Sequence, residues 1–338
     1  MQKAFITGLA GVELTADERA FLARERPAGL ILFARNCRDA EQIRRLVTDF
    51  KAAVGASDVL VLIDQEGGRV QRLKPPIARL LPPAAAFAAL FPGNLDAAAA
   101  AAYAVARLAA DDLKALGVDT SCAPVLDVPV PGAHDIIGNR AYSRDPDAIV
   151  RLGGAVADGL MDGGVLPVMK HIPGHGRALA DSHLELPVVT APEAELAASD
   201  FATFTRLARI PSAMTAHVVF NSLDRSAPAS TSRHVTEAII RGRIGFDGLL
   251  MSDDLSMKAL SGTFAERTRA VIDAGSDLAL HCNGDLAEMQ AVASASPVLE
   301  ARALQRFERA LAVARAAPKP YDAAAAETVL AELLGVVA

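Results

Sequence analysis

Eight short apolar segments, each followed by a segment with helical periodicity, constrain the fold of this chain more than any other feature. Apolar runs of this length, bounded by residues that favour turns, are typical of buried strands. They span residues 3–8, 29–33, 59–64, 119–125, 165–171, 211–218, 248–253 and 277–282. Strands that are apolar on both faces and alternate with helices pair in parallel, with right-handed crossovers. Eight such units predict a TIM-type (β/α)8 barrel, an α/β fold, and a doubly wound open sheet is the alternative.

Two connecting segments show the helical pattern plainly. Residues 39–54 and 95–117 carry apolar side chains at helical spacing, and the second ends at Gly117. Glycine commonly terminates a helix because it adopts left-handed backbone angles without strain. The chain has no linker rich in Pro, Gly or Ser, so we expect one barrel domain over residues 1–338. Residues from about 300 onward are predicted to form extra C-terminal helices.

Charge and composition narrow the class of ligand. The net charge is −6, whereas a protein that binds nucleic acid needs an excess of Lys and Arg for the phosphates. We see neither a secretory signal nor an apolar run long enough to span a bilayer, so we expect no membrane association. Three cysteines without C-x-x-C spacing are typical of reduced thiols in a cytoplasm. These features predict a cytoplasmic protein with a small-molecule ligand.

Polar residues follow the predicted strands at the point where each strand ends. In a (β/α)8 barrel these positions share one rim, where such enzymes carry their active sites. Any one of them has a simpler explanation, since a polar residue after a strand often caps the next helix. The positions are Arg35 and Asn36, Asp64 to Glu66, Asp127, Lys170 and His171, His217, Asp253 and Asp254, and Cys282 and Asn283.

Two of these segments carry carboxylates that could act in catalysis or in ligand binding. In "LLMSDDLSM" an apolar strand leads to Asp253 and Asp254; we expect one to cap the next helix and the other to act as a nucleophile or electrostatic stabiliser. In "IDQEGGRVQR" a Gly pair allows a tight turn that brings Asp64 and Arg72 toward the barrel mouth. Asp beside Arg suits a polyol or a carboxylated sugar. A surface salt-bridge network is the alternative for this segment.

The segment "KHIPGHGRALADSH" places three of the seven histidines within residues 170–183. Pro173 and Gly174 exclude a helix, so these imidazoles lie on a strand end or a loop. Asp181 can hold His183 by a hydrogen bond, fixing its tautomer and raising its pKa toward neutrality. A zinc site is the rival interpretation, but Lys170 would repel a cation. We leave His175 unassigned and expect no metal ion or cofactor.

Six motifs, in order along the chain, together resemble the cytosolic β-N-acetylglucosaminidases of glycoside hydrolase family 3, enzymes of bacterial peptidoglycan recycling. They are "LIDQEGGRVQR", "APVLDV", "IGNRAYSRD", "KHIPGHGRALADSHLELP", "AHVVF" and "GFDGLLMSDDLSM". The resemblance implies that Asp253 is the nucleophile and that His183, partnered by Asp181, is the general acid/base. It also implies sugar-binding positions at Asp64, Arg72, Arg140, Lys170 and His171. The family's fold is a (β/α)8 barrel.

The function expected from this resemblance is removal of terminal β-linked N-acetylglucosamine from muropeptides, with retention of configuration. A retaining glycosidase forms a covalent glycosyl-enzyme that water later cleaves. An imidazole suits the proton transfers, since its ordinary pKa near 6.5 lets it donate in one step and accept in the next. Phosphorolysis and non-catalytic sugar binding are the alternatives. We expect a monomer or weak dimer.

Overall fold

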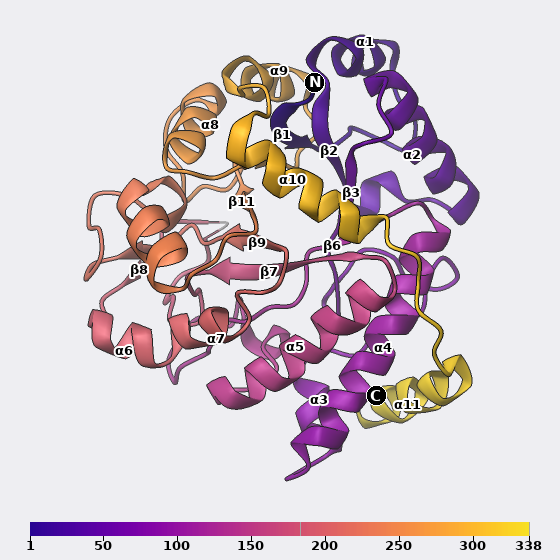
Figure 1. Cartoon of the computed structure of the whole chain (residues 1–338), viewed down its shortest axis with the longest axis vertical. Helices are drawn as coiled ribbons and strands as arrows, with labels where there is room; N and C mark the ends of the chain where they lie inside the picture. Colours follow the sequence, from indigo (N-terminus) through magenta and orange to yellow (C-terminus); the bar gives the residue numbers. More distant parts are fainter. Residues whose placement is uncertain (183, 338) are drawn as a thin grey trace.

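Eight parallel strands close into a barrel in the computed structural model, which describes residues 1–182 and 184–337 (Figure 1). Strand β1 pairs with β2 on one side and with β12 on the other, which closes the sheet. This closure confirms the predicted (β/α)8 barrel and excludes the open sheet. The strands, in chain order, are β1 (Lys3–Thr7), β2 (Pro27–Leu32), β3 (Leu60–Ile63), β6 (Thr120–Ser121), β7 (Leu166–Ile172), β9 (Ser212–Thr215), β11 (Leu249–Asp254) and β12 (Leu278–His281).

The strands are apolar throughout because both of their faces are buried. In β3, Leu60 and Leu62 belong to the cluster inside the barrel, whereas Val61 and Ile63 belong to the cluster under the surrounding helices. This alternation follows from the two-residue period of a strand. All eight predicted strands are present. The largest difference in bounds is at β6, where the regular pairing ends at Ser121 and a single bridge beyond it joins Val125 to Lys170.

Helices surround the barrel and begin and end at residues suited to those positions. Helix α2 starts after Asp39, whose side chain accepts a hydrogen bond from the N–H of Gln42, and α4 is followed by Gly117 at φ +80°. No helix within the described residues is long and apolar enough to cross a membrane. The helices are α1 (Ala16–Glu25), α2 (Ala40–Val54), α3 (Ala85–Leu90), α4 (Leu95–Ala115), α5 (Pro146–Asp162), α6 (Glu193–Ala198), α7 (Asp200–Arg206), a π-helix (Val235–Arg243), α8 (Phe264–Asp273), α9 (Leu286–Ala295), α10 (Ala301–Ala314) and α11 (Ala323–Val337).

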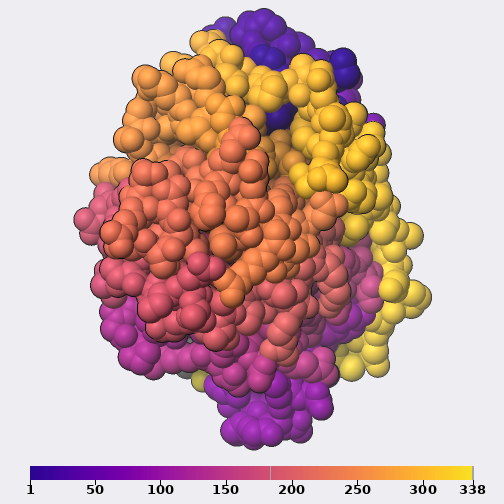
Figure 2. Space-filling view, turned by 60° about the vertical axis from the view of Figure 1, so that its left-hand side comes forward, coloured from indigo at the N-terminus to yellow at the C-terminus, as the bar shows by residue number. Residues whose placement is uncertain are grey.

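The predicted C-terminal helices are α10 and α11. Helix α10 lies across the amino end of the barrel, where Phe307 and Leu311 join the same buried cluster as Leu166 and Leu249 at the strand starts (Figure 1). Helix α11 packs on α3 and α4. The C-terminal segment therefore runs along one side of the molecule, from the N-terminal residues to the region of α3 (Figure 2). It closes the end of the barrel opposite the rim where the polar residues gather.

Two small sheets stand on that rim, beyond the carboxyl ends of the barrel strands. Strands β4 (Gln65–Gly67) and β5 (Val70–Gln71) form an antiparallel hairpin directly after β3. Strands β8 (Val188–Val189) and β10 (Val219–Phe220) pair in parallel and join the segments that follow β7 and β9. Both sheets give a fixed backbone to segments that would otherwise be loops around the mouth of the barrel.

Candidate active site

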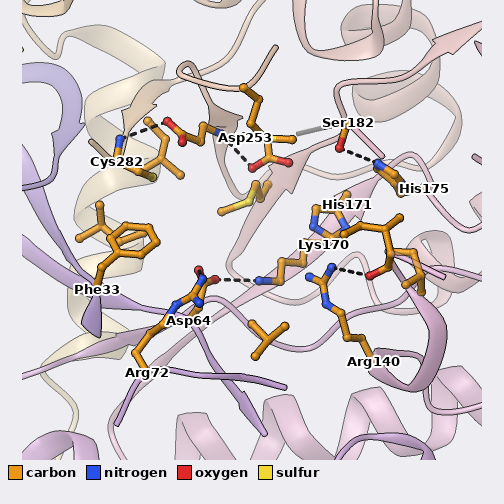
Figure 3. A pocket seen from close by; sticks show the side chains of 18 of the residues that line it. Phe33, Asp64, Arg72, Arg140, Lys170, His171, His175, Ser182, Asp253 and Cys282 are labelled. Carbon is orange, nitrogen blue, oxygen red and sulfur yellow. Dashed lines mark hydrogen bonds and ion pairs between the residues drawn. The ribbon is translucent and has the colours of Figure 1, made fainter. Parts of the chain in front are cut away.

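A cavity of about 530 Å³ opens at the carboxyl ends of the barrel strands (Figure 3). Its volume suits one sugar residue and part of a second group. Its walls come from the ends of β2, β3, β7, β11 and β12 and from the loops after β5, β6 and β7. Six of the residues predicted for the site line this cavity: Asp64, Arg72, Arg140, Lys170, His171 and Asp253.

The β4–β5 hairpin returns Arg72 to Asp64, the residue directly after β3. Arg72 Nη2 donates to Asp64 Oδ2 at 2.8 Å. The turn requires glycine at Gly67, where φ is +101° and a Cβ would lie 2.2 Å from the carbonyl oxygen of Pro82. The side chain of Gln65 supports the hairpin from inside, since its Oε1 accepts from the N–H groups of Arg72 and Leu73 at 3.1 Å each. The predicted turn is confirmed, and the Asp64–Arg72 pair faces the cavity rather than the outer surface.

Lys170 connects two carboxylates from this hairpin region. Its Nζ lies 3.0 Å from Asp64 Oδ1 and 2.6 Å from Glu66 Oε1, and all three side chains are largely buried. Arg140 binds the other side of Glu66 through two hydrogen bonds of 2.8 Å. This bidentate geometry is the strongest form of such a pair.

The charges of this group determine its ionisation. Burial by itself raises the pKa of Asp64, but Lys170 and Arg72 outweigh it and hold that pKa well below its ordinary value. The pKa of Glu66 is likewise lowered, because Lys170 and Arg140 outweigh its burial. Burial alone would lower the pKa of Lys170, but the two carboxylates raise it. All of these groups are therefore charged near neutral pH.

Asp127, fully buried beneath the cavity, organises two histidines. Its Oδ1 accepts from the backbone N–H of His171 at 3.2 Å and of His175 at 2.7 Å, and its Oδ2 lies 2.7 Å from His171 Nδ1. Burial raises the pKa of Asp127, but these hydrogen bonds and the two imidazoles lower it below its ordinary value. With an ionised acceptor at Nδ1, the proton of a neutral His171 ring lies on that nitrogen, which leaves Nε2 as an acceptor.

Asp253 and Asp254, at the end of β11, have different roles. Asp253 projects into the cavity from the side opposite Asp64 and Lys170, and its Oδ1 accepts the N–H of Asp254 at 2.8 Å (Figure 3). Asp254 Oδ1 instead accepts the backbone N–H groups of Ser256 and Cys282, at 3.0 and 3.1 Å. Asp254 thus holds the turn after β11, and only Asp253 keeps a carboxylate oxygen directed at the cavity. The expectation that one Asp of the pair caps the next helix is wrong, because the side chain of Thr263 caps α8, whereas Asp254 holds the turn after β11.

The surroundings of Asp253 keep it ionised. Burial raises its pKa, but His217 and His171 lower it further than burial raises it. The N–H of Asp254 and the charge of Lys170 add to this lowering. His217 itself is buried, and burial lowers its pKa. Its Nε2 lies 3.1 Å from the carbonyl oxygen of Asp254, which can only accept, so Nε2 carries the proton.

The segment that follows β7 carries the remaining predicted residues. His183 lies outside the described residues. The carbonyl oxygen of Asp181 accepts from the N–H groups of Leu184 and Glu185 at 2.9 and 3.0 Å. Ser182 is buried and lines the cavity, and its Oγ lies 3.0 Å from His175 Nε2. The acid/base roles of Asp181 and His183 therefore stay predictions.

Sequence reasoning did not assign a role to several residues that shape the site. Glu66, Asp127 and His217 were placed on the rim only by their position after a strand, and no signal identified their partners. Phe33 had no signal at all, since it reads as the last residue of an apolar strand. Its ring nevertheless forms part of the wall, with the guanidinium groups of Arg35 and Arg72 at 5.0 and 5.1 Å from its centroid.

The comparison with protein families decides the classification. The model described as the glycosyl hydrolase family 3 N terminal domain matches residues 5–313. The chain belongs to glycosyl hydrolase family 3. Family 3 membership confirms the resemblance found in the six sequence motifs, and residues 5–313 contain almost all of the barrel and of α10.

Individual family 3 relatives extend this result. A β-hexosaminidase of Alkalilimnicola ehrlichii is 41% identical over 280 residues, which are 82% of this chain and 79% of that protein. A β-hexosaminidase of Pseudomonas aeruginosa is 37% identical over 91% of this chain and 88% of that protein. Together these similarities identify the chain as an enzyme, a glycoside hydrolase of the β-hexosaminidase type.

A solved family 3 structure matches along nearly the whole chain. The crystal structure of NagZ from Neisseria gonorrhoeae, in complex with N-trifluoroacetyl-D-glucosamine, has a TM-score of 0.87 and 33% identity. The match covers 98% of each chain. An N-acylated glucosamine is thus a ligand of a protein with this barrel and with no additional large domain.

Proposed function

We propose that this chain is a retaining exo-β-N-acetylglucosaminidase that removes terminal N-acetylglucosamine from peptidoglycan-derived muropeptides. The observation that carries the proposal is the ionised carboxylate of Asp253, directed into a sugar-sized cavity in which Asp64, Arg72, Arg140 and Lys170 form ion pairs with one another or with Glu66. The cavity then presents one carboxylate placed to act as a nucleophile. We propose that residues 1–338 form a single catalytic unit and that it works in the cytoplasm.

In the first step, Asp253 attacks the anomeric carbon of the terminal sugar. An oxygen lone pair of the carboxylate forms the new glycosyl ester bond, while the electrons of the glycosidic bond pass to the leaving oxygen. The low pKa of Asp253 keeps this group ionised near neutral pH, as a nucleophile requires. In the second step, water attacks the same carbon and releases the carboxylate, which restores the original configuration.

The leaving oxygen needs a proton, which we assign to His183 with Asp181 as its partner. The same imidazole then takes a proton from the attacking water. This assignment rests on the D-S-H motif of residues 181–183. Ser182, between the two, lines the cavity that also contains Asp253, which supports a role for this segment in catalysis.

The sugar is proposed to bind to Asp64, Arg72, Arg140, Lys170 and His171. Each lines the cavity, and the four charged residues among them are linked in one network through Glu66. Because these charges are compensated within the protein, the site offers directional hydrogen bonds to hydroxyl and acetamido groups without attracting an ion. A network that is already ordered loses little conformational freedom when the sugar binds.

The substrate assignment extends the activity of the relatives to a specific aglycone. We propose a disaccharide of the N-acetylglucosaminyl-1,6-anhydro-N-acetylmuramic acid type, with or without a peptide. Phosphorolysis remains the second candidate, because a histidine acid/base places no negative charge near an attacking phosphate. Assaying the products with and without inorganic phosphate separates the two: a sugar 1-phosphate identifies phosphorolysis, and free N-acetylglucosamine under both conditions identifies hydrolysis.

The decisive experiment is to trap the glycosyl-enzyme. A slow substrate, such as a 2-fluoro or 5-fluoro glycoside, is incubated with the enzyme, and the labelled peptide is mapped by mass spectrometry. We expect one sugar on the peptide that contains Asp253 and none on an Asp253→Ala variant. A label on another residue, or hydrolysis by Asp253→Ala at the wild-type rate, would remove Asp253 as the nucleophile.

A further inference from the structure

His175 has no role in the proposed mechanism, but it contacts the segment that carries the proposed acid/base. Its Nε2 lies 3.0 Å from the hydroxyl oxygen of Ser182, and both side chains are buried. Ser182 immediately precedes His183 in the chain. Figure 3 shows the two side chains pointing toward one another at the edge of the cavity, on the side of His171.

The backbone around His175 is fixed by contacts with neighbouring segments of the barrel rim. Its N–H donates to Asp127 Oδ1 at 2.7 Å, inside the barrel rim. The next residue, Gly176, lies so close to the loop after β6 that a Cβ would be 2.2 Å from the carbonyl oxygen of Val128. Arg177 then donates to the buried carboxylate of Asp200 at 2.7 Å. His175 is thus a fixed point on the scaffold.

Ser182 is held at two points that belong to different strands. Its hydroxyl meets His175, which follows β7, and its carbonyl oxygen accepts the N–H of Ala259 at 3.3 Å, in the segment that follows β11. Strand β11 also carries Asp253. The two contacts therefore tie Ser182 to the end of β7 and to the segment that continues from the proposed nucleophile.

The His175 ring is unsuited to proton transfer. Burial, and then the neighbouring His171, lower its pKa to about 4, so the ring is neutral at the pH where the enzyme works. Nδ1 is buried and has no hydrogen-bond partner among the described residues. Within the described part of the chain, the ring therefore makes its polar contact through Nε2. The partner in this contact is the neutral hydroxyl group of Ser182.

We propose that His175 is a positioning residue that acts through Ser182 to fix the chain next to the acid/base. The proposal rests on the proposed function, in which His183 donates the proton. General acid catalysis depends on placing the donor within hydrogen-bond reach of the leaving oxygen. A hydrogen bond from a ring that is itself anchored to the barrel limits the positions open to Ser182, the residue adjacent to that donor.

The proposal predicts that the loss of activity caused by removing this hydrogen bond depends on the leaving group of the substrate. A glycoside whose aglycone is a second sugar needs protonation to leave, whereas an activated aryl glycoside such as a nitrophenyl glycoside needs little. Loss of the His175–Ser182 hydrogen bond should lower kcat/KM for the disaccharide by about 10-fold, the value of one buried hydrogen bond. It should lower kcat/KM for the nitrophenyl glycoside by less than about 3-fold, because the departure of nitrophenolate depends little on protonation by the enzyme.

The test uses variants that remove or keep this one hydrogen bond. Ser182→Ala removes the hydroxyl, and His175→Phe removes both ring nitrogens while keeping the ring. Ser182→Thr and His175→Gln retain a polar group at each end. Ser222→Ala is the matched control, because Ser222 is exposed and its hydroxyl likewise makes one hydrogen bond, to the carbonyl oxygen of Ala191.

We expect Ser182→Ala, His175→Phe and the double variant to lose activity on the disaccharide by the same factor, because each removes the same bond. Ser182→Thr and His175→Gln should recover part of it, and Ser222→Ala should match wild type. Equal losses on both substrates, or losses that multiply in the double variant, would overturn the positioning role. Wild-type leaving-group selectivity in Ser182→Ala would overturn it as well.

His183→Ala separates this proposal from the proposed function. If His183→Ala is selectively slow on the disaccharide but Ser182→Ala and His175→Phe are not, only the positioning role fails. If His183→Ala slows both substrates equally, the acid/base assignment fails and the positioning role fails with it.

Discussion

The imidazole Nδ1 of His171 lies 2.7 Å from a carboxylate oxygen of Asp127, and the other oxygen of the same carboxylate accepts the backbone N–H groups of His171 and His175. One buried charge thus fixes the ring of a proposed sugar-binding residue and the backbone of the segment that follows it. Asp127 does not line the cavity, so we expect it to influence catalysis chiefly through these two histidines, with which it makes its hydrogen bonds.

Replacing Asp127 with Asn tests this influence. The amide oxygen can still accept the backbone N–H groups, but the NH2 group then faces His171 Nδ1 and forces the other tautomer. We expect kcat/KM to fall about 10- to 100-fold, which corresponds to one charge-assisted hydrogen bond. Asp119→Asn is the control, because Asp119 also accepts a backbone N–H, from Val61 at 2.8 Å, but at the amino end of β6. An equal loss of activity in both variants would contradict a specific role for Asp127.

Lys170→Met should destabilise the protein strongly. It leaves the buried carboxylates of Asp64 and Glu66 near each other with one cation fewer, and breaking a buried ion pair costs about 3 to 5 kcal/mol. The free energy of unfolding, measured with urea, should recover partly in Lys170→Met combined with Glu66→Gln. A double variant less stable than Lys170→Met would show that the repulsion between the two carboxylates is not the cause.

The charged residues Asp64, Glu66 and Lys170 also predict how the free energy of unfolding varies with pH. The pKa values of Asp64 and Glu66 are lowered in the folded protein, so their contribution is fully present above the ordinary carboxyl range, near pH 4, and is lost as the pH falls through the folded values. The raised pKa of Lys170 acts in the opposite sense, so its contribution is fully present below about pH 10 and is lost only above that.

Urea unfolding of wild type and Glu66→Gln at several pH values checks this. We expect the stability advantage of wild type to be constant between about pH 6 and 9 and to shrink below about pH 4. An advantage that grew as the pH fell would mean that Glu66 is not ionised in the folded protein.

Phe307→Ala should separate stability from activity. Phe307 is buried where α10 meets the amino ends of the strands, at the opposite end of the barrel from the cavity. Truncating a buried Phe costs about 3 to 5 kcal/mol. We expect a lower melting temperature but an unchanged KM and kcat at a temperature where the variant is folded. A changed KM would indicate that the base of the barrel and its mouth are coupled.

His183→Ala tests the acid/base assignment through the pH profile as well as through the leaving group. An imidazole that must be protonated in the first step gives a kcat/KM that falls as the pH rises through its pKa, ordinarily near 6.5. That alkaline limb should disappear in His183→Ala, measured on a disaccharide substrate. A limb that persists unchanged in the variant belongs to another group.

The barrel was predictable because its strands are apolar on both faces, which makes each a continuous run such as "LVLI" in β3. The strand ends were harder to predict, as β6 shows: the apolar pattern continues to Val125, but the regular pairing ends at Ser121 and only a single bridge follows, between Val125 and Lys170. Binary patterns locate an element, whereas its last hydrogen bond depends on single residues.

Positions in the cavity wall were predictable where motif and position agreed, at Asp253, Asp64 and Lys170, and the roles of these residues stay predictions. The ion pairs of the site were not predictable from the sequence. Glu66 and Lys170, for example, lie far apart in the chain and meet only because β3 and β7 both belong to the closed barrel. The turn-holding role of Asp254 was not predicted, since a helix cap was expected of one Asp of the pair. The contact between His175 and Ser182 could not be predicted either, because it depends on the path of the whole loop between them. Local rules predict which groups can act, and the tertiary fold selects their partners.

Helix α10 closes the amino end of the barrel, opposite the mouth of the cavity. The barrel interior beneath the site is filled by side chains such as Leu62, Val168 and Met251, and α10 seals the amino end below them. A polysaccharide therefore cannot pass through the protein, and whatever enters by the mouth must leave by it.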